Sequence, residues 1–296
     1  MNTHSNAAAE SRLQSQEFAT AVLAALRPLY WSIRRELWES RYLYIAPLAA
    51  AALYLIGFAI SAVRLRLHHG TPSSDHDELA AALIMGTVLI VGLFYSLDAL
   101  YGERRDRSIL FWKSLPVSDT TAVISKLAIP ILILPLLSFV ISIATQILML
   151  LLSGVIFAGS GVHIAGAWTL ASFLRVPAIW LYHLVTVHGL WYAPLYCWLL
   201  LVSAWAPRAP FLWACLPGFV IYGVEKIAFN TSYFLNMLRY RLEGPGSGMT
   251  AEHQQDFTST LIPHHLLSTP GLWTGLGFAA VFLYLTVQLR RSRGPI

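Results

Sequence analysis

Residues 127–153 read LAIPILILPLLSFVISIATQILMLLLS and contain no charged side chain. An α-helix rises about 1.5 Å per residue, so this stretch is long enough to cross the roughly 30 Å hydrocarbon core of a bilayer. With the residues before it, it forms an apolar block over about 122–153, which is too long for one straight crossing. Pro130 and Pro135 interrupt this block. We therefore expect a tilted or kinked helix whose freed carbonyl groups are covered by neighbouring helices.

Similar apolar blocks recur along the whole chain. Its 296 residues are 56% hydrophobic and 12% charged, whereas a soluble domain carries roughly 25% charge, and the mean hydropathy is +0.60. The blocks are unbroken rather than alternating, which excludes an outer-membrane barrel. The sequence therefore predicts an all-α, polytopic membrane protein with six transmembrane helices. The predicted spans are residues 43–63, 80–100, 122–153, 178–204, 211–229 and 271–289.

The distribution of Lys and Arg predicts the topology. With both termini inside, 14 of the 20 basic residues fall in inner segments, as the positive-inside rule requires. We expect a multi-pass protein of a bacterial inner (cytoplasmic) membrane, with both termini cytoplasmic. Residues 1–42 would form a cytoplasmic N-terminal segment, 43–289 the transmembrane domain and 290–296 a cytoplasmic tail. Residues 154–182 would form an external connection that is partly embedded in the membrane.

Several function classes are disfavoured by the same numbers. The net charge of +5 comes from bases beside apolar blocks rather than from one basic stripe, so we predict no nucleic-acid partner. Cys197 and Cys215 lie in apolar segments, where neither a disulfide framework nor a cysteine-rich metal site is expected. Nine of the ten histidines fall on the predicted outer side, but none shows a full ligand set. We therefore predict no bound metal.

The segment before the first span has the pattern of an amphipathic helix. Pro28 is expected to divide it in two, and charged residues, Glu36 among them, fall largely away from the apolar positions. Trp31 and Trp38, with arginines, would lie in the headgroup plane of the inner leaflet. A generic anchor and a role in coupling both remain open. The residues assigned to this interfacial helix are Phe18, Val22, Leu26, Trp31, Ile33, Leu37 and Trp38.

The loop between the second and third spans, residues 98–119, reads DALYGERRDRSILFWKSLPVSD. A charged half, residues 103–107, precedes an apolar half, residues 109–112. Pro116 would end the helix, and Ser118 would cap the next one. Four apolar residues in a cytoplasmic loop need burial. They rest either on the bilayer or in a groove of another protein.

This loop resembles the first cytoplasmic loop of permease subunits of ABC-2 type transporters. In that family an acidic, arginine-rich segment leads into a short coupling helix that ends in Leu-Pro and inserts into a cleft of the ATPase subunit. Residues 198–213, with their short inner turn, resemble the family's connection between spans four and five. The resemblance covers nearly the whole chain from Trp31 onward.

The resemblance implies a permease subunit of an ATP-driven exporter for a hydrophobic or amphipathic substrate. The sequence has no G-x-x-x-x-G-K-[ST] phosphate loop, so the chain is not expected to be an enzyme or to bind a cofactor; ATP and Mg would be bound by a partner ABC ATPase subunit. Six spans make half of that family's usual bundle, so the resemblance also implies a homodimer, or a heterodimer with a second permease. Phe111 and Trp112 would be apolar anchors, with Arg104, Asp106 and Arg107 as a polar rim. The residues assigned to ATPase coupling are Glu103, Arg104, Asp106, Arg107, Ile109, Phe111, Trp112, Leu115 and Pro116.

Glu225 lies in the fifth predicted span, near its outer end. An intramembrane carboxylate usually faces protein or a water-filled cavity, so Glu225 would line a translocation path or support the external helices. Lys226 is adjacent and points about 100° away, so the two cannot pair. The external insert that follows, residues 230–270, is predicted to begin with a helix over Ser232–Leu242 and to break at 244–248.

Two other function classes remain open. A membrane scaffold that recruits a cytoplasmic protein would use the loop over 98–119 equally well. An intramembrane serine protease would need a nucleophile such as Ser160 in Gly-Ser-Gly, with His183 or His188 as base, but the first glycine of its usual motif is replaced by Ala158. The H-E-x-x-H motif of metalloproteases does not occur.

Overall fold

The computed structural model describes residues 27–68, 76–114, 117–158, 179–243 and 266–295. These residues form helices joined by short turns, and no strand occurs among them, which confirms the all-α prediction for this part of the chain. A helix over residues 27–39 comes first, and a helical segment over 179–183 runs into η3. The remaining elements are α2 (Tyr42–Leu67), α3 (His76–Asp98), α4 (Tyr101–Arg105), α5 (Ser108–Ser114), α6 (Asp119–Ala128), η1 (Ile129–Ile133), α7 (Leu134–Ile156), η3 (Leu184–Trp191), α9 (Ala193–Trp205), α10 (Pro210–Phe229), α11 (Tyr233–Glu243), η5 (Leu266–Ser268) and α13 (Pro270–Ser292).

Five helical segments are long and apolar enough to cross a membrane. They cover Tyr42–Leu67, Leu79–Arg105, Asp119–Ile156, Pro210–Phe229 and Pro270–Ser292. The predicted span 178–204 is found as a bent pair, Ile179–Trp191 and Ala193–Trp205, with 48° between its halves. Counted as one crossing, this pair would make a sixth span.

The third span contains the predicted irregularity. Ile129–Ile133, which includes Pro130, is a single π-helical turn between α6 and α7, and Pro135 stands at the start of α7. Proline has no N–H to donate to the preceding turn, and the wider π-turn accommodates this loss. Ser138 donates to the carbonyl of Pro135 at 2.8 Å.

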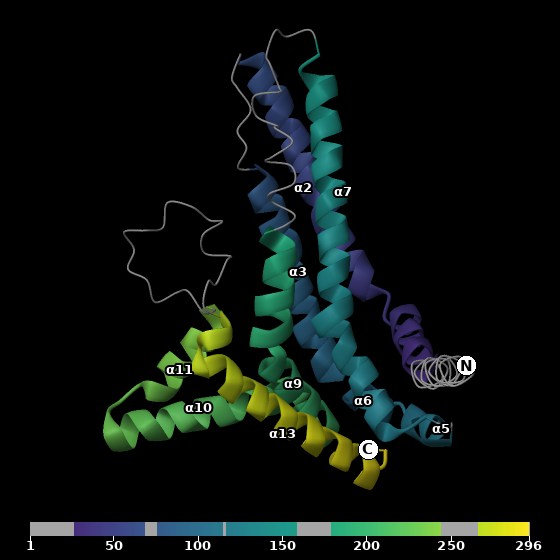
Figure 1. Cartoon of the computed structure of the whole chain (residues 1–296), viewed down its shortest axis with the longest axis vertical. Helices are drawn as coiled ribbons and strands as arrows, with labels where there is room; N and C mark the ends of the chain where they lie inside the picture. The colour runs from purple at the N-terminus through teal and green to yellow at the C-terminus, as the bar shows by residue number, and fades with distance from the viewer. Residues whose placement is uncertain (1–26, 69–75, 115–116, 159–178, 244–265, 296) are drawn as a thin grey trace, which may run out of the picture.

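The helices form two groups (Figure 1). The long helices α2, α3 and α7 lie together along the longest axis, whereas α10, α11 and α13 run across it at one end. One apolar core cluster, made by Leu43, Val88, Tyr95, Ile129 and Leu134, joins α2, α3 and the third span. No residue of α10 is buried, although all of them are described. This helix is therefore the least enclosed candidate span.

The N-terminal helix meets the same core cluster. Ile33 and Leu37 pack against it, so this part of the predicted apolar face lies on the protein. Glu36, which was expected largely away from that face, is only 4% exposed. Phe18, Val22 and Leu26 lie outside the described residues, as does most of the predicted connection over 154–182.

Candidate functional site

A buried ionic cluster lies where the N-terminal helix, α4, α6 and α13 meet. Glu103, at 8% exposure, is at its centre. Its Oε1 lies 3.1 Å from Nζ of Lys126 and 3.3 Å from Nη2 of Arg35, and its Oε2 accepts a hydrogen bond from Nη1 of Arg290 at 2.8 Å. One carboxylate thus pairs with three cations from three other segments.

Glu36 is the second carboxylate of the cluster. It accepts hydrogen bonds from Nζ of Lys126 at 2.9 Å, from the hydroxyl of Tyr95 at 2.8 Å and from Arg35. Burial by itself would raise the pKa of Glu36, but the charge and hydrogen bond of Lys126, the charge of Arg35 and the Tyr95 hydrogen bond outweigh it and lower the pKa to about 2. Glu36 is therefore ionised at neutral pH.

Asp119 completes the cluster, because its Oδ1 lies 3.1 Å from Nε of Arg290. Three carboxylates (Glu36, Glu103, Asp119) thus face three cations (Arg35, Lys126, Arg290), and their formal charges cancel. Charges buried in this way are tolerated only when paired and hydrogen-bonded. The ionic cluster is therefore a fixed junction between separate segments.

Arg104 was predicted to lie on a polar rim at the surface. It is instead buried, with 7% exposure. Its Nη1 donates to the carbonyls of Ala204 at 2.8 Å and Ala206 at 3.2 Å. Those carbonyls lie at the end of α9, where a helix leaves its acceptors unpaired and favours a cation. Arg104 therefore joins α4 to α9.

Ser203 of α9 makes a second connection to the start of α4. Its hydroxyl accepts the backbone N–H groups of Leu100 at 3.0 Å and Tyr101 at 2.9 Å. Helix α4 is thus bonded to α9 at its first turn as well as through Arg104.

The short helix α5 is set against the ionic cluster on one side. Ile109 is 2% exposed, and the ring of Trp112 lies under the guanidinium of Arg35, 3.5 Å from its carbon to the ring centroid. Lys113 donates to the carbonyl of Arg293 at 3.1 Å. The expectation that all four apolar residues of this loop lack a partner in the chain was wrong for Ile109 and Trp112.

The other side of α5 is open. Leu110 is 58% exposed and Phe111 60% exposed, and the Phe111 ring meets Trp112 edge to face at 4.9 Å. Asp106 and Arg107 are exposed nearby, and Asp106 pairs with Arg105 at 3.0 Å. The exposed apolar surface of the loop is therefore reduced to Leu110 and Phe111. Leu115 and Pro116 lie outside the described residues.

Local sequence signals set the two ends of this loop. Arg107 has a positive φ of 60°, which turns the chain between α4 and α5 so that the two helices are not continuous. Ser118 accepts a hydrogen bond from the backbone N–H of Thr121 at 3.1 Å, so the predicted cap of the next helix is confirmed.

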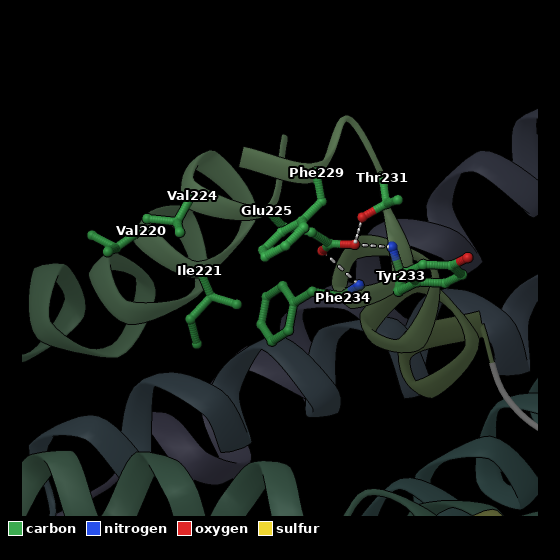
Figure 2. A pocket seen from close by; sticks show the side chains of 8 residues that line it. All are labelled: Val220, Ile221, Val224, Glu225, Phe229, Thr231, Tyr233 and Phe234. Atoms are coloured by element: carbon green, nitrogen blue, oxygen red, sulfur yellow. Dashed lines mark hydrogen bonds between the residues drawn. The ribbon is translucent and has the colours of Figure 1, made fainter. Parts of the chain in front are cut away.

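Glu225 lies at a different place, in the hairpin of α10 and α11 (Figure 2). Its Oε1 accepts hydrogen bonds from the hydroxyl of Thr231 at 2.8 Å and from the backbone N–H of Tyr233, and its Oε2 accepts the N–H of Phe234 at 2.9 Å. The carboxylate thus caps the first turn of α11. This geometry favours the predicted role of Glu225 as a support for the helix that follows its own.

A groove of about 660 Å³ opens beside this carboxylate. Its other walls are mainly apolar, with Val220, Ile221 and Val224 on one side and Phe234 on the other. Both oxygens of Glu225 already accept hydrogen bonds within the hairpin, so the groove offers apolar contact rather than a free carboxylate for a substrate.

The far end of α11 is fixed by an arginine. The guanidinium of Arg241 lies over the ring of Trp191 at 4.4 Å and donates to the carbonyl of Gly271 at 2.9 Å. The indole N–H of Trp191 donates to the backbone carbonyl of Arg241 at 2.9 Å. Burial lowers the pKa of Arg241. A Cβ on Gly275 would come within 1.9 Å of the guanidinium, so a glycine is needed there for this close approach.

The histidine and serine candidates of the enzyme hypotheses gain no support from geometry. His188 is fully buried, and its Nε2 lies 3.1 Å from the hydroxyl of Tyr196. Ser160 lies outside the described residues. Among the side chains that the structure describes, no three from His, Cys, Asp and Glu gather as a metal site would require.

Sequence reasoning missed most partners of Glu103. Lys126 was counted only as a base of the inner side, although a lone lysine inside an apolar block is itself a signal for a buried partner. Arg290 was counted only among bases of the inner side.

Comparisons of the chain with protein-family models, curated proteins and solved structures give no match.

Proposed function

We propose that this chain is the membrane-spanning permease subunit of an ABC-2 type exporter, which couples ATP hydrolysis by a separate ATPase subunit to movement of a hydrophobic or amphipathic substrate. Its place would be a bacterial inner membrane, with both termini cytoplasmic and a second permease, identical or similar, beside it. The observation that carries this proposal is the short helix α5, which presents Leu110 and Phe111 outward while its other side is anchored.

The exposed pair has the character of a docking surface. Phe111 offers an aromatic side chain of the kind that contributes most to interfaces, and the charged residues Arg105, Asp106 and Arg107 stand beside it. A groove on an ATPase could bury this pair with charged residues at its edge.

The ionic cluster gives such docking a mechanical consequence. Glu103 lies in α4, five residues before α5 begins, and pairs with Lys126 of the third span and Arg290 of the last. Movement of α5 by an ATPase would therefore displace those two spans as well, because breaking a buried ion pair is costly, about 3 to 5 kcal/mol. ATP would be hydrolysed by the partner ATPase, and this chain would transmit the resulting movement from α5 to its spans.

The experiment compares two matched substitutions. The tagged full-length chain is purified from its native membranes in mild detergent, and ATP hydrolysis in the eluate is measured. Wild type is expected to carry a vanadate-sensitive ATPase, and Phe111→Asp is expected to lose most of it. The control is Leu67→Asp, because Leu67 is 72% exposed and lies at the end of α2 away from the N-terminal helix. This variant should retain the ATPase activity.

Trp112→Asp is a poor test by itself, because Trp112 also stacks on Arg35 and its loss would disturb the ionic cluster. Equal ATPase recovery with Phe111→Asp and wild type would contradict the proposal.

A scaffold that recruits a cytoplasmic protein is the second candidate, favoured by the same exposed pair. Co-reconstitution of the chain and the captured ATPase in liposomes separates the two. A permease is expected to change the ATP hydrolysis rate of its partner and to move lipid or dye only with ATP. A scaffold would bind the partner and leave both quantities unchanged.

A further inference from the structure

The N-terminal helix carries a second feature on the face opposite Glu36. Arg27, Trp31, Arg34, Trp38 and Arg41 follow one another at alternating intervals of four and three residues. At about 100° per residue, the first four lie within an arc of about 60° on the helix over residues 27–39. Arg41 follows two residues after that helix ends, at the N-cap of α2. We call this surface the arginine–tryptophan stripe. Its two tryptophans are 58% and 68% exposed, so it faces away from the protein.

Arg34 occupies the middle of the stripe. Its guanidinium carbon lies 5.2 Å from the ring centroid of Trp31 and 4.6 Å from that of Trp38. Contacts with the faces of two rings restrict the guanidinium without using its N–H groups. The planar fork of donors is therefore held ready for an anion at the surface.

The stripe also lacks counter-charges. Within the described residues, no carboxylate pairs with Arg27, Arg34 or Arg41, whereas Arg35 of the same helix pairs with Glu36, Glu39 and Glu103. The acidic residues of this helix thus serve its inner side. Arg27 and Arg34 on the outer side, and Arg41 just after the helix, remain available to an anionic partner.

We propose that the arginine–tryptophan stripe binds the phosphate groups of anionic phospholipids. Arg41 directly precedes Tyr42, the first residue of the first candidate span, so the stripe lies where the chain enters the membrane. Tryptophan prefers the headgroup level, and a guanidinium pairs with a phosphate through two parallel hydrogen bonds. An acidic protein would match the arginines but would not explain the alternating exposed tryptophans at this position. The proposal rests on membrane insertion of α2 and not on transport.

The test measures lipid binding to the purified full-length chain. The protein in detergent is titrated with dioleoyl phosphatidylglycerol or dioleoyl phosphatidylcholine, and bound lipids are counted by native mass spectrometry. Tighter binding of the anionic lipid is expected. Arg34→Gln should weaken phosphatidylglycerol binding about fivefold, since one basic residue near a membrane surface contributes about 1 kcal/mol. Binding of phosphatidylcholine should not change.

The control is Arg64→Gln, which changes the net charge equally at the other, exposed end of α2 and should leave binding as in wild type. The double variant Arg27→Gln/Arg41→Gln changes only exposed positions, so it tests the stripe even where Arg34→Gln folds poorly. Equal binding of both lipids by wild type, or equal effects of Arg34→Gln and Arg64→Gln, would overturn the proposal and favour an acidic protein partner.

Arg34→Lys tests the stacked geometry. Lysine keeps the charge but has no planar fork, so its phosphatidylglycerol binding should fall between those of wild type and Arg34→Gln. Wild-type binding of phosphatidylglycerol by Arg34→Lys would show that binding depends on net charge alone. It would contradict a site built around the guanidinium.

Discussion

Glu103 and Glu225 are both glutamates at or within candidate spans, yet they are satisfied in different ways. Glu103 pairs with the side chains of Arg35, 68 residues away, and Arg290, 187 residues away. Glu225 accepts hydrogen bonds from groups only six to nine residues ahead. The first carboxylate therefore connects segments that are far apart in the sequence, and the second organises its own hairpin. A substitution of Glu103 should therefore have a larger effect on stability, spread over more segments, than a substitution of Glu225.

The largest effect is expected for Glu103→Gln. It leaves Lys126 and Arg290 without their shared charge partner, and removing one member of a buried ion pair costs about 3 to 5 kcal/mol. The measurement is the midpoint of unfolding by sodium dodecyl sulfate in mixed micelles. Asp106→Asn, an exposed change in the same loop, should shift stability by less than about 0.5 kcal/mol. Equal midpoints for the two variants would mean that the ionic cluster does not stabilise the fold.

Acidification should weaken the ionic cluster through Glu36. Its pKa is lowered from 4.5 to about 2 in the folded state, so its stabilisation is fully present above about pH 5 and is lost as pH falls toward 2. The contribution is at most about 3 kcal/mol. It is measured as the change in thermal midpoint, followed by tryptophan fluorescence, between pH 6 and 3.

Glu36→Gln should be less stable at pH 6 and should lose less on acidification than wild type. Glu39→Gln, whose carboxylate is largely exposed, should keep the wild-type pH profile. A Glu36→Gln profile parallel to that of wild type would assign the acid sensitivity to other groups.

Glu225→Gln should have a smaller and local effect. The amide nitrogen of glutamine cannot accept the N–H that Glu225 Oε2 now accepts, and the neutral side chain interacts less with the helix N-terminus. We expect roughly fivefold faster hydrogen exchange of the Tyr233 and Phe234 amides. Lys226→Gln is the matched control and should leave that exchange unchanged. Faster exchange across α2 and α3 as well in Glu225→Gln would contradict a local role.

The smallest effect is expected for Gly275→Ala. The new methyl group would displace the guanidinium of Arg241 from Trp191 and from the carbonyl of Gly271, at a cost of about 1 kcal/mol. Gly277→Ala, where a Cβ meets nothing within 4 Å, should instead be neutral or slightly stabilising. The difference between the unfolding midpoints of the two variants in detergent measures what the Arg241 contact contributes to stability. Equal midpoints for Gly275→Ala and Gly277→Ala would mean that this contact contributes nothing.

Features that depend on neighbouring residues were predictable. The helix expected over Ser232–Leu242 is found at Tyr233–Glu243, and Ser118 caps its helix as expected. Caps, prolines and apolar runs act within a few residues, so the chain alone carries the information. The candidate site was predicted only in part. Glu103 and Arg104 were selected, but as part of an exposed loop, and seven residues of α5 are too few for periodicity to show that Ile109 is buried and Phe111 exposed.

The sequence by itself determined that this chain is helical and suited to a membrane, because the apolar blocks between charged and turn-forming residues leave few other ways to satisfy the backbone. The tertiary structure alone decided which charges pair. Lys126 meets Glu36 across 90 residues and Arg290 meets Glu103 across 187. No local pattern encodes such distances, since the partners become neighbours only after the spans have packed. That packing buries one face of the N-terminal helix in the ionic cluster and leaves the arginine–tryptophan stripe on the other.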